Sequence, residues 1–89
     1  MPQFEELLAE KTSITTPWYV VLFNDDIHTF DDVSIQLVKA TGCPMSEAEG
    51  LAWTVHSKGK ARVFDGDLES CLRVSGVLRE IALVTEVQG

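Results

Sequence analysis

The sequence lacks several features that mark common classes of small protein. It contains two cysteines, Cys43 and Cys71, which do not form a Cys-x-x-Cys pair. We therefore expect free thiols in a reducing compartment and no disulfide framework. No apolar run is long enough to cross a bilayer, and no basic and then apolar signal segment begins the chain. These absences predict a cytoplasmic protein without a membrane partner.

Basic residues are also scarce. Seven lysines and arginines stand against 14 aspartates and glutamates, which gives a formal net charge of -7 at pH 7. An acidic surface repels phosphates, so we expect no nucleic-acid partner. The charge suits a basic partner or a cationic ligand group, although solubility alone also accounts for it. The 89 residues, 45% of them hydrophobic, are enough for one domain with one core.

The spacing of apolar residues predicts an α+β fold. We interpret residues 1–16 as a flexible arm and residues 17–89 as one domain. The expected elements are a strand at 18–23, a helix at 30–40, a helix at 46–58, a strand at 60–64, a helix at 68–78 and a strand at 81–87. A small three-stranded antiparallel sheet with three helices packed on one face accommodates this order.

Helix boundaries have clear signals in this sequence. We predict that the three helices begin at capping residues: the first at Thr29 with Asp32, the second at Ser46 with Glu49, and the third at Asp65 or Asp67. Gly42 and Gly59 are placed to end the first two helices.

Polar side chains that accept hydrogen bonds are concentrated in the connection between the first predicted strand and the first predicted helix. Asn24 and Asp26 share one strand face, whereas Asp25 points to the other side as a solvent or capping residue. His56 follows at the end of the apolar stripe of the second helix. An amide oxygen, a carboxylate and a neutral imidazole that converge suit a compact cation with three donors, which describes a primary ammonium. An α-amino group, with a pKa of roughly 8, fits that description.

Other interpretations of these residues stay open. Two aspartates at a strand end also form an ordinary turn with a helix cap, and a histidine at a helix end is often only packed or exposed. A metal site from Asp25, Asp26, His28 and His56 is conceivable, but no helical histidine pair or cysteine cluster supports it. A hydrolase would need a nucleophile with a base, and no glycine loop is present to hold phosphate. We expect neither a cofactor nor a metal.

Three blocks of the chain resemble the ClpS family of adaptors. Residues 19–26 (YVVLFNDD) resemble the family's strand and Asn-Asp-Asp signature, and residues 28–33 (HTFDDV) resemble one branch's continuation. Residues 52–61 (AWTVHSKGKA) resemble the family's Val-His-x-x-Gly-x-Ala block. The likeness covers approximately residues 17 to 87, and two such blocks at this separation are far more specific than one short motif.

The resemblance implies a non-catalytic protease adaptor. ClpS proteins bind substrates whose N-terminal residue is Leu, Phe, Tyr or Trp, known as N-degrons. They deliver these substrates to an AAA+ unfoldase, ClpA or ClpC, which feeds the peptidase ClpP, and the N-terminal arm engages the unfoldase. By this resemblance Asn24, an aspartate of the pair Asp25 and Asp26, and His56 hold the α-amino group, and the shared strand face of Asn24 and Asp26 favours Asp26 as that aspartate. The side-chain pocket would be formed by His28, Phe30, Val33, Ala52, Val55 and Leu83.

Some positions depart from the family pattern. Phe30 and Ala52 both stand where many members have methionine, so the first change narrows the pocket and the second widens it. His28 replaces a commonly smaller residue at the rim, where we expect it to be exposed. The alternative function is a plain protein-interaction module, since the fold also resembles the C-terminal domain of the ribosomal stalk protein, which lacks an amine pocket.

Overall fold

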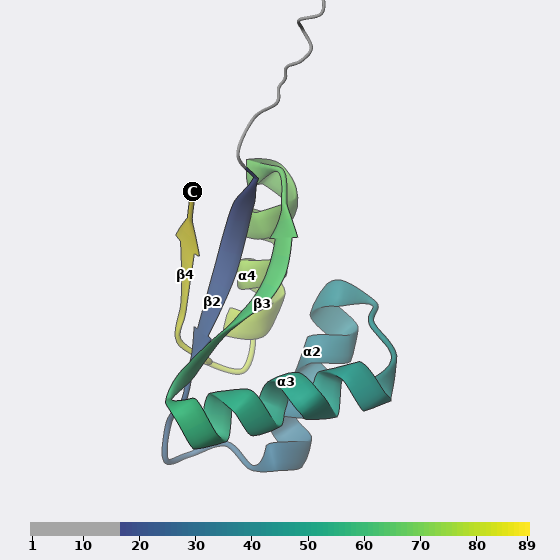
Figure 1. Ribbon diagram of the computed structural model, residues 1–89, viewed down its shortest axis with the longest axis vertical. Helices are drawn as coiled ribbons and strands as arrows, with labels where there is room; N and C mark the ends of the chain where they lie inside the picture. The colour runs from purple at the N-terminus through teal and green to yellow at the C-terminus, as the bar shows by residue number, and fades with distance from the viewer. Residues whose placement is uncertain (1–16) are drawn as a thin grey trace, which may run out of the picture.

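The computed structural model describes residues 17–89, and the predicted arm lies outside them. The chain runs through β2 (Trp18–Phe23), α2 (Phe30–Thr41), α3 (Met45–Lys58), β3 (Lys60–Gly66), α4 (Leu68–Arg79) and β4 (Thr85–Gln88). The three strands form an antiparallel sheet in the order β3-β2-β4. The predicted α+β fold and the order of its elements are confirmed (Figure 1).

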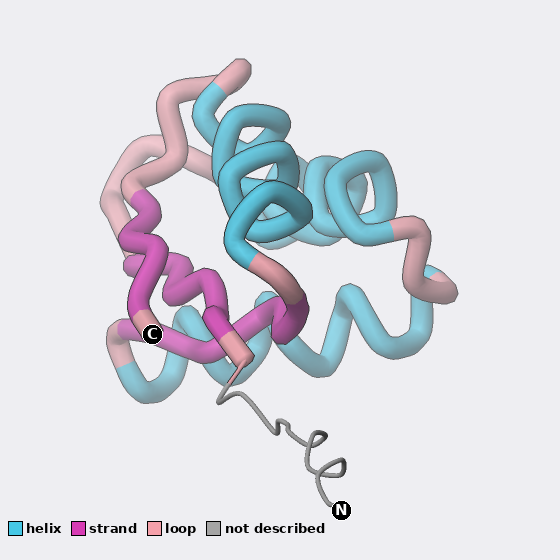
Figure 2. The backbone as a smooth tube through the Cα atoms, turned by 90° about the horizontal axis from the view of Figure 1, so that it is seen from above, coloured by secondary structure: helices cyan, strands magenta, loops and turns pink. Residues whose placement is uncertain are grey.

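Strand β2 is the centre of the sheet because its apolar run is covered from both sides. Val20 and Leu22 are fully buried in the core beneath the helices. On the opposite face Val21 pairs across to Arg62 on β3. The guanidinium of Arg62 lies 3.9 Å from the centre of the Tyr19 ring, so a long polar side chain covers this open face. In Figure 2 the C-terminal end of β4 lies beside the start of β2, as their antiparallel pairing requires.

The start of α2 follows the predicted capping box. The Thr29 hydroxyl accepts a hydrogen bond from the Asp32 backbone at 3.0 Å, and the Thr29 backbone donates to the Asp32 carboxylate at 3.1 Å. Gly42 ends the helix in the left-handed conformation, with φ of 77°.

The predicted capping box at Ser46 and Glu49 is wrong. Helix α3 begins at Met45, and Pro44 stands at the cap position in an extended conformation, without a side-chain capping bond. The Pro44 carbonyl accepts from the backbone of both Glu47 and Ala48 at 3.0 Å. Because proline fixes φ near the value this position needs, the cap lies two residues before the expected Ser46, the helix starts one residue before the expected 46, and Ser46 falls inside its first turn.

The second half of the chain matches the prediction with shifted boundaries. Asp67, one of the two candidates, caps α4 by accepting from the Ser70 backbone. Strand β3 extends to Gly66. Strand β4 is shorter than predicted, because the chain turns after α4 with Ala82 in a left-handed conformation, φ 64°. Residues 80–84 therefore form a linker between α4 and β4.

The core joins the sheet to all three helices. Helix α4 lies along the sheet, and α2 and α3 pack against each other at one end of it (Figure 1). The fully buried side chains include Leu22, Leu37, Val74, Leu78 and Cys71. Both cysteines are free, and burial raises the pKa of the Cys71 thiol. Among the described residues, no helix is long and apolar enough to cross a membrane.

Candidate functional site

A pocket of about 600 Å³ opens between the loop that follows β2 and the paired helices α2 and α3. Nine of the ten side chains selected from the sequence line it. They are Asn24, Asp25, Asp26, His28, Phe30, Val33, Ala52, Val55 and His56. Residues 24–30 and 52–56, far apart in the chain, are thus brought to one hollow.

The polar end of the pocket is built by the loop at Asn24. The backbone N–H of Asn24 donates to the Gly59 carbonyl at 2.9 Å, which ties the start of the loop to the C-terminal end of α3. His56 lies one turn before that end and is exposed at the pocket. The backbone therefore places an amide and an imidazole on the same rim, as the sequence predicted.

Asp25, expected to be a solvent or capping residue directed away from the site, instead lines the pocket and holds the backbone of the loop. Its Oδ1 accepts from the backbone N–H groups of Ile27 and His28, each at 2.9 Å. Its Oδ2 lies 2.7 Å from Nδ1 of the His28 ring. Burial opposes ionisation of this carboxyl, but the hydrogen bonds outweigh it, so the pKa of Asp25 is lowered. A carboxylate offers roughly four lone-pair sites, so about one remains for a ligand.

The expectation that His28 is exposed is wrong. Its side chain is 11% exposed and bridges two acceptors, the Asp25 carboxylate and the backbone carbonyl of Ile81. The hydrogen bond with Asp25 raises the pKa of His28, desolvation acts against it, and the Ile81 carbonyl and the charges of Asp25 and Asp32 add to the rise. The loop is therefore anchored to the α4–β4 linker as well as to α3.

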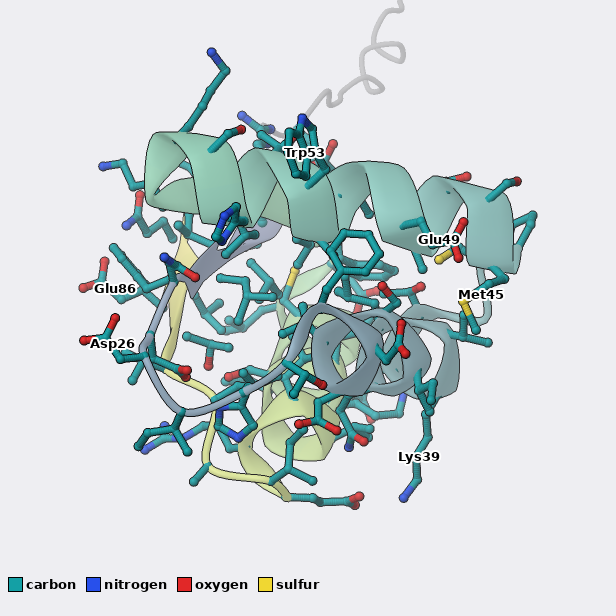
Figure 3. The ribbon with its side chains drawn as sticks, turned by 90° about the horizontal axis from the view of Figure 1, so that it is seen from below. Asp26, Lys39, Met45, Glu49, Trp53 and Glu86 are labelled. Carbon is teal, nitrogen blue, oxygen red and sulfur yellow. The ribbon has the colours of Figure 1, made fainter. Side chains whose placement is uncertain are left out.

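Asp26 has a different environment from its neighbour. It is exposed and lines the pocket, and Figure 3 places it at the edge of the fold. Within residues 17–89 its carboxylate has no hydrogen-bond or ion-pair partner. The pair thus consists of one carboxylate fixed by the loop and one facing solvent at the mouth of the pocket.

The apolar end of the pocket comes from the two helices. Ala52 and Val55 of α3 are each 3% exposed and form its inner wall. Val33 of α2 is half-buried, and Phe30 in the first turn of α2 is 42% exposed. An uncovered phenylalanine at a concave surface is available to an apolar ligand group.

Leu83 does not line this pocket. It is 3% exposed and belongs to the hydrophobic core with Val20 and Leu78. The turn at Ala82 directs the chain back to the sheet, where the Val84 carbonyl accepts from the Phe23 backbone at 3.0 Å. Leu83 is thereby drawn into the core, beside a separate hollow formed by residues 79 and 82–85.

Two lining residues, Thr29 and Trp53, were missed in the sequence. Trp53 is 61% exposed and stands out from α3 in Figure 3. Its ring centre lies 5.7 Å from that of His56. The spacing of three residues, which places two helical side chains on one face, was the signal available for Trp53.

The described residues contain no group of three or more His, Cys, Asp or Glu side chains arranged to hold a metal. The pocket has hydrogen-bond acceptors at one end and apolar surface at the other. This arrangement can bind an ammonium group attached to an apolar side chain.

Comparison with protein families identifies the fold and its family together. Residues 13–84 match the model of "ATP-dependent Clp protease adaptor protein ClpS". The chain belongs to the ClpS family. Its structure is similar to that of Agrobacterium tumefaciens ClpS2 bound to L-phenylalaninamide, with a TM-score of 0.66 and 18% identity. That likeness covers 82% of this chain and 98% of ClpS2, and it shows a shared ClpS fold.

Two much larger proteins carry a similar segment. The human E3 ubiquitin-protein ligase UBR2 is 39% identical over 61 residues, or 68% of this ClpS-family chain. Mouse UBR2 is 38% identical over 71 residues, or 80% of the chain. The matched segment spans 4% of the length of each ligase.

Proposed function

We propose that this ClpS-family adaptor binds the free α-amino group and the large apolar first side chain of N-degron substrates. The observation that carries the proposal is that one pocket has acceptors at one end and apolar walls at the other. Membership of the family supports the adaptor role, and the ClpS2 relative of the same fold is bound to L-phenylalaninamide, which has a free amine and an aromatic side chain.

The ammonium group is held at the polar end. Asn24, Asp25, Asp26 and His56 supply the acceptors. Charge-assisted hydrogen bonds are about twice as strong as neutral ones, so the charge of the amine matters as much as its donors. His56 accepts as a neutral imidazole, through the ring nitrogen that carries no proton. An internal or acetylated amide is rejected because it leaves desolvated acceptors unpaired, at about 1–3 kcal/mol each.

The first side chain enters the apolar end. Val33, Ala52 and Val55 surround it, and Phe30 covers it from α2. Burial of one large apolar side chain contributes about 1.5–3 kcal/mol. The small Ala52 leaves depth opposite Phe30, which suits the large residues Leu, Phe, Tyr and Trp. His28, which also lines the pocket, acts on the polar side rather than as an apolar wall.

The bound substrate is then delivered to an AAA+ Clp unfoldase of the ClpA or ClpC type for degradation. The adaptor itself performs no catalysis. Residues 1–16 act as the arm that engages the unfoldase. This part of the proposal is supported by the family alone.

A peptide titration tests the binding proposal. A labelled peptide that begins with Phe is titrated beside the same peptide N-acetylated and beside one that begins with Ala. We expect binding of the first peptide and at least tenfold weaker binding of the other two, the equivalent of about 1.4 kcal/mol. Equal affinity for the free and acetylated peptides would instead favour a plain interaction module of ClpS fold.

Delivery needs a separate assay. A fluorescent protein that begins with Phe is mixed with a ClpA or ClpC unfoldase, ClpP and ATP. We expect this chain to accelerate its degradation, and a chain that lacks residues 1–16 to bind the peptide equally well while failing to accelerate degradation. Acceleration without the arm would overturn the arm's assigned role and leave the pocket's role intact.

A further inference from the structure

The bridge made by His28 is the feature of the site that the proposed function does not use. It joins two segments 53 residues apart, the loop after β2 and the linker before β4. On the loop side the ring meets the Asp25 carboxylate, and on the linker side it meets the Ile81 backbone carbonyl. The ring is almost covered, with 11% of the side chain exposed.

The chemistry of the two partners determines the protonation state of the ring. A carboxylate and a carbonyl accept hydrogen bonds and donate none. A neutral imidazole donates from one nitrogen only, so its second nitrogen would direct a lone pair at an acceptor. An imidazolium donates to both partners at once. The bridge is therefore complete only in the protonated ring.

Both ends of the bridge bear on the amine site. Asp25 lines the pocket, and its Oδ1 holds the backbone N–H groups of Ile27 and His28. The Ile81 end lies next to Ala82, whose left-handed conformation turns the linker toward the sheet. The linker is a fixed point because the backbone bond from Phe23 to Val84 attaches it to β2. His28 thus fastens the Asp25 loop to a rigid part of the fold.

We propose that His28 is a positioning residue of the amine site: as an imidazolium it holds Asp25 against the Ile81 carbonyl, so that ligand binding weakens when the ring loses its proton. The proposal rests on the proposed function for its ligand, a peptide with a free α-amino group. The clamp itself belongs to the free protein and can be measured without any ligand.

The charges around the ring support this assignment. From its own loop the ring faces Asp25, and from α2 it feels the charge of Asp32. The α4–β4 linker contributes the Ile81 carbonyl. All three favour the proton and the pKa of His28 is raised, although desolvation acts against it. A bound ammonium repels the imidazolium, but both cations share the Asp25 carboxylate.

The first test follows His28 in the free protein. The chain has two histidines, so His56→Gln leaves His28 as the single one, and NMR of its ring gives an isolated titration. We expect a titration midpoint above the ordinary value of about 6.5, with protons on both ring nitrogens below the midpoint. Asp25→Asn in the same background should lower it. A midpoint at or below the ordinary value, unmoved by Asp25→Asn, would overturn the clamp.

The second test measures the dissociation constant of a Phe-first peptide across pH for the wild type and for His28→Gln. The ratio of the two dissociation constants cancels every pH effect that the two proteins share, including protonation of the peptide amine. We expect the variant to bind about tenfold more weakly at low pH, the equivalent of about 1.4 kcal/mol, and the ratio to fall toward one as pH rises through the His28 midpoint.

The outcomes separate the clamp from a merely structural role. A ratio that stays constant with pH, or that rises with pH because repulsion of the ammonium dominates, contradicts the proposal. Ile27→Ala is the matched control, because Ile27 is the adjacent loop residue and is 84% exposed. The ratio of its dissociation constant to that of the wild type should stay near one at every pH. If the wild type binds no peptide, the proposed function fails, and the titration of His28 still decides whether the clamp exists.

Discussion

The two ends of the pocket are constructed differently. At the polar end the chain is fixed by bonds to distant segments: Asn24 to Gly59, and His28 to Ile81. At the apolar end the innermost wall is buried, yet the outer aromatic groups, Phe30 and Trp53, are 42% and 61% exposed. The difference indicates a preformed acceptor site beside an apolar surface that still has area to lose on binding. Preformation matters because ordering a loop at the moment of binding subtracts from affinity.

The largest effect is expected from breaking the fixed end at Asp25. Asp25→Asn removes the charge that the amine needs and weakens the bond to His28, so affinity for a Phe-first peptide should fall about a hundredfold or more, or at least 2.7 kcal/mol. Thermal unfolding should show a stability loss as well. Asp26→Asn is the matched comparison: it should weaken peptide binding by a smaller factor and leave stability unchanged. Equal stability of the two variants would contradict the different environments of the two carboxylates.

The second prediction concerns His56 at the same end. His56→Ala should weaken binding of the free-amine peptide about tenfold, the equivalent of about 1.4 kcal/mol, while leaving the already weak acetylated peptide unchanged. Ser57→Ala is the control, since Ser57 is exposed and bonds only to the Trp53 carbonyl among the residues that the structure describes. A loss shared by both peptides would place His56 outside the amine site.

The third prediction concerns Phe30 at the apolar end of the pocket. Phe30→Ala should reduce affinity for Leu-first and Phe-first peptides about fivefold to tenfold, since less apolar area is buried around the side chain. Ile35→Ala is the matched control on α2, because Ile35 is also exposed and does not line the pocket. If Ile35→Ala weakens binding of Phe-first peptides to the same extent, the loss reflects a change in helix α2 as a whole and not a contact between Phe30 and the ligand.

The pH dependence of stability sharpens the comparison at the polar end. Asp25 has a lowered pKa when folded, so its contribution is present above about 3.9 and is lost as pH falls through the folded value. His28 has a raised pKa, so its contribution is complete below about 6.5 and is lost as pH rises through the folded value. Denaturant titrations should therefore show greatest stability between these limits, with the alkaline loss absent in His28→Gln.

The smallest effect is expected at the cap between the two ends. Thr29→Ala should lower the unfolding free energy by about 1 kcal/mol, because it removes the acceptor for the Asp32 backbone. Thr54→Ala serves as control, since its hydroxyl bonds the Gly50 carbonyl within α3. Peptide affinity should change less than twofold in both. A large binding loss with Thr29→Ala would mean that the cap also shapes the pocket.

The sequence revealed those parts of the site that depend on local chemistry. The turn held by Asp25 and the cap at Thr29 both depend on side chains within a few residues of their partners. The fold was predictable for the same reason, because the local spacing of apolar residues and the residues at the helix ends indicate where helices and strands lie. The alternation argument was wrong, because the strand ends at Phe23 and Asp25 lines the pocket together with Asn24 and Asp26.

What the sequence concealed depends on backbone partners far along the chain. The His28 ring meets a backbone carbonyl 53 residues away, and a carbonyl has no sequence signature, so the ring was expected to be exposed. Leu83 went to the core because Ala82 turns the linker, although alanine rarely adopts a positive φ. At α3 two start signals overlapped, and the fixed φ of Pro44 took precedence over the hydroxyl of Ser46.

The central claim is that one ligand occupies both ends of the pocket, with its amine at the loop and its side chain between the helices. The most direct measurement is a map of amide NMR shifts for three ligands: a Phe-first peptide, its N-acetylated form and a Gly-first peptide. We predict that the first shifts the signals of Asn24, Asp25, Ala52 and Val55 together. The Gly-first peptide at high concentration should shift the amide signals of Asn24 and Asp25 and leave those of Ala52 and Val55 unchanged. Identical maps for the free and acetylated Phe-first peptides, or a map that avoids the loop, would contradict the account.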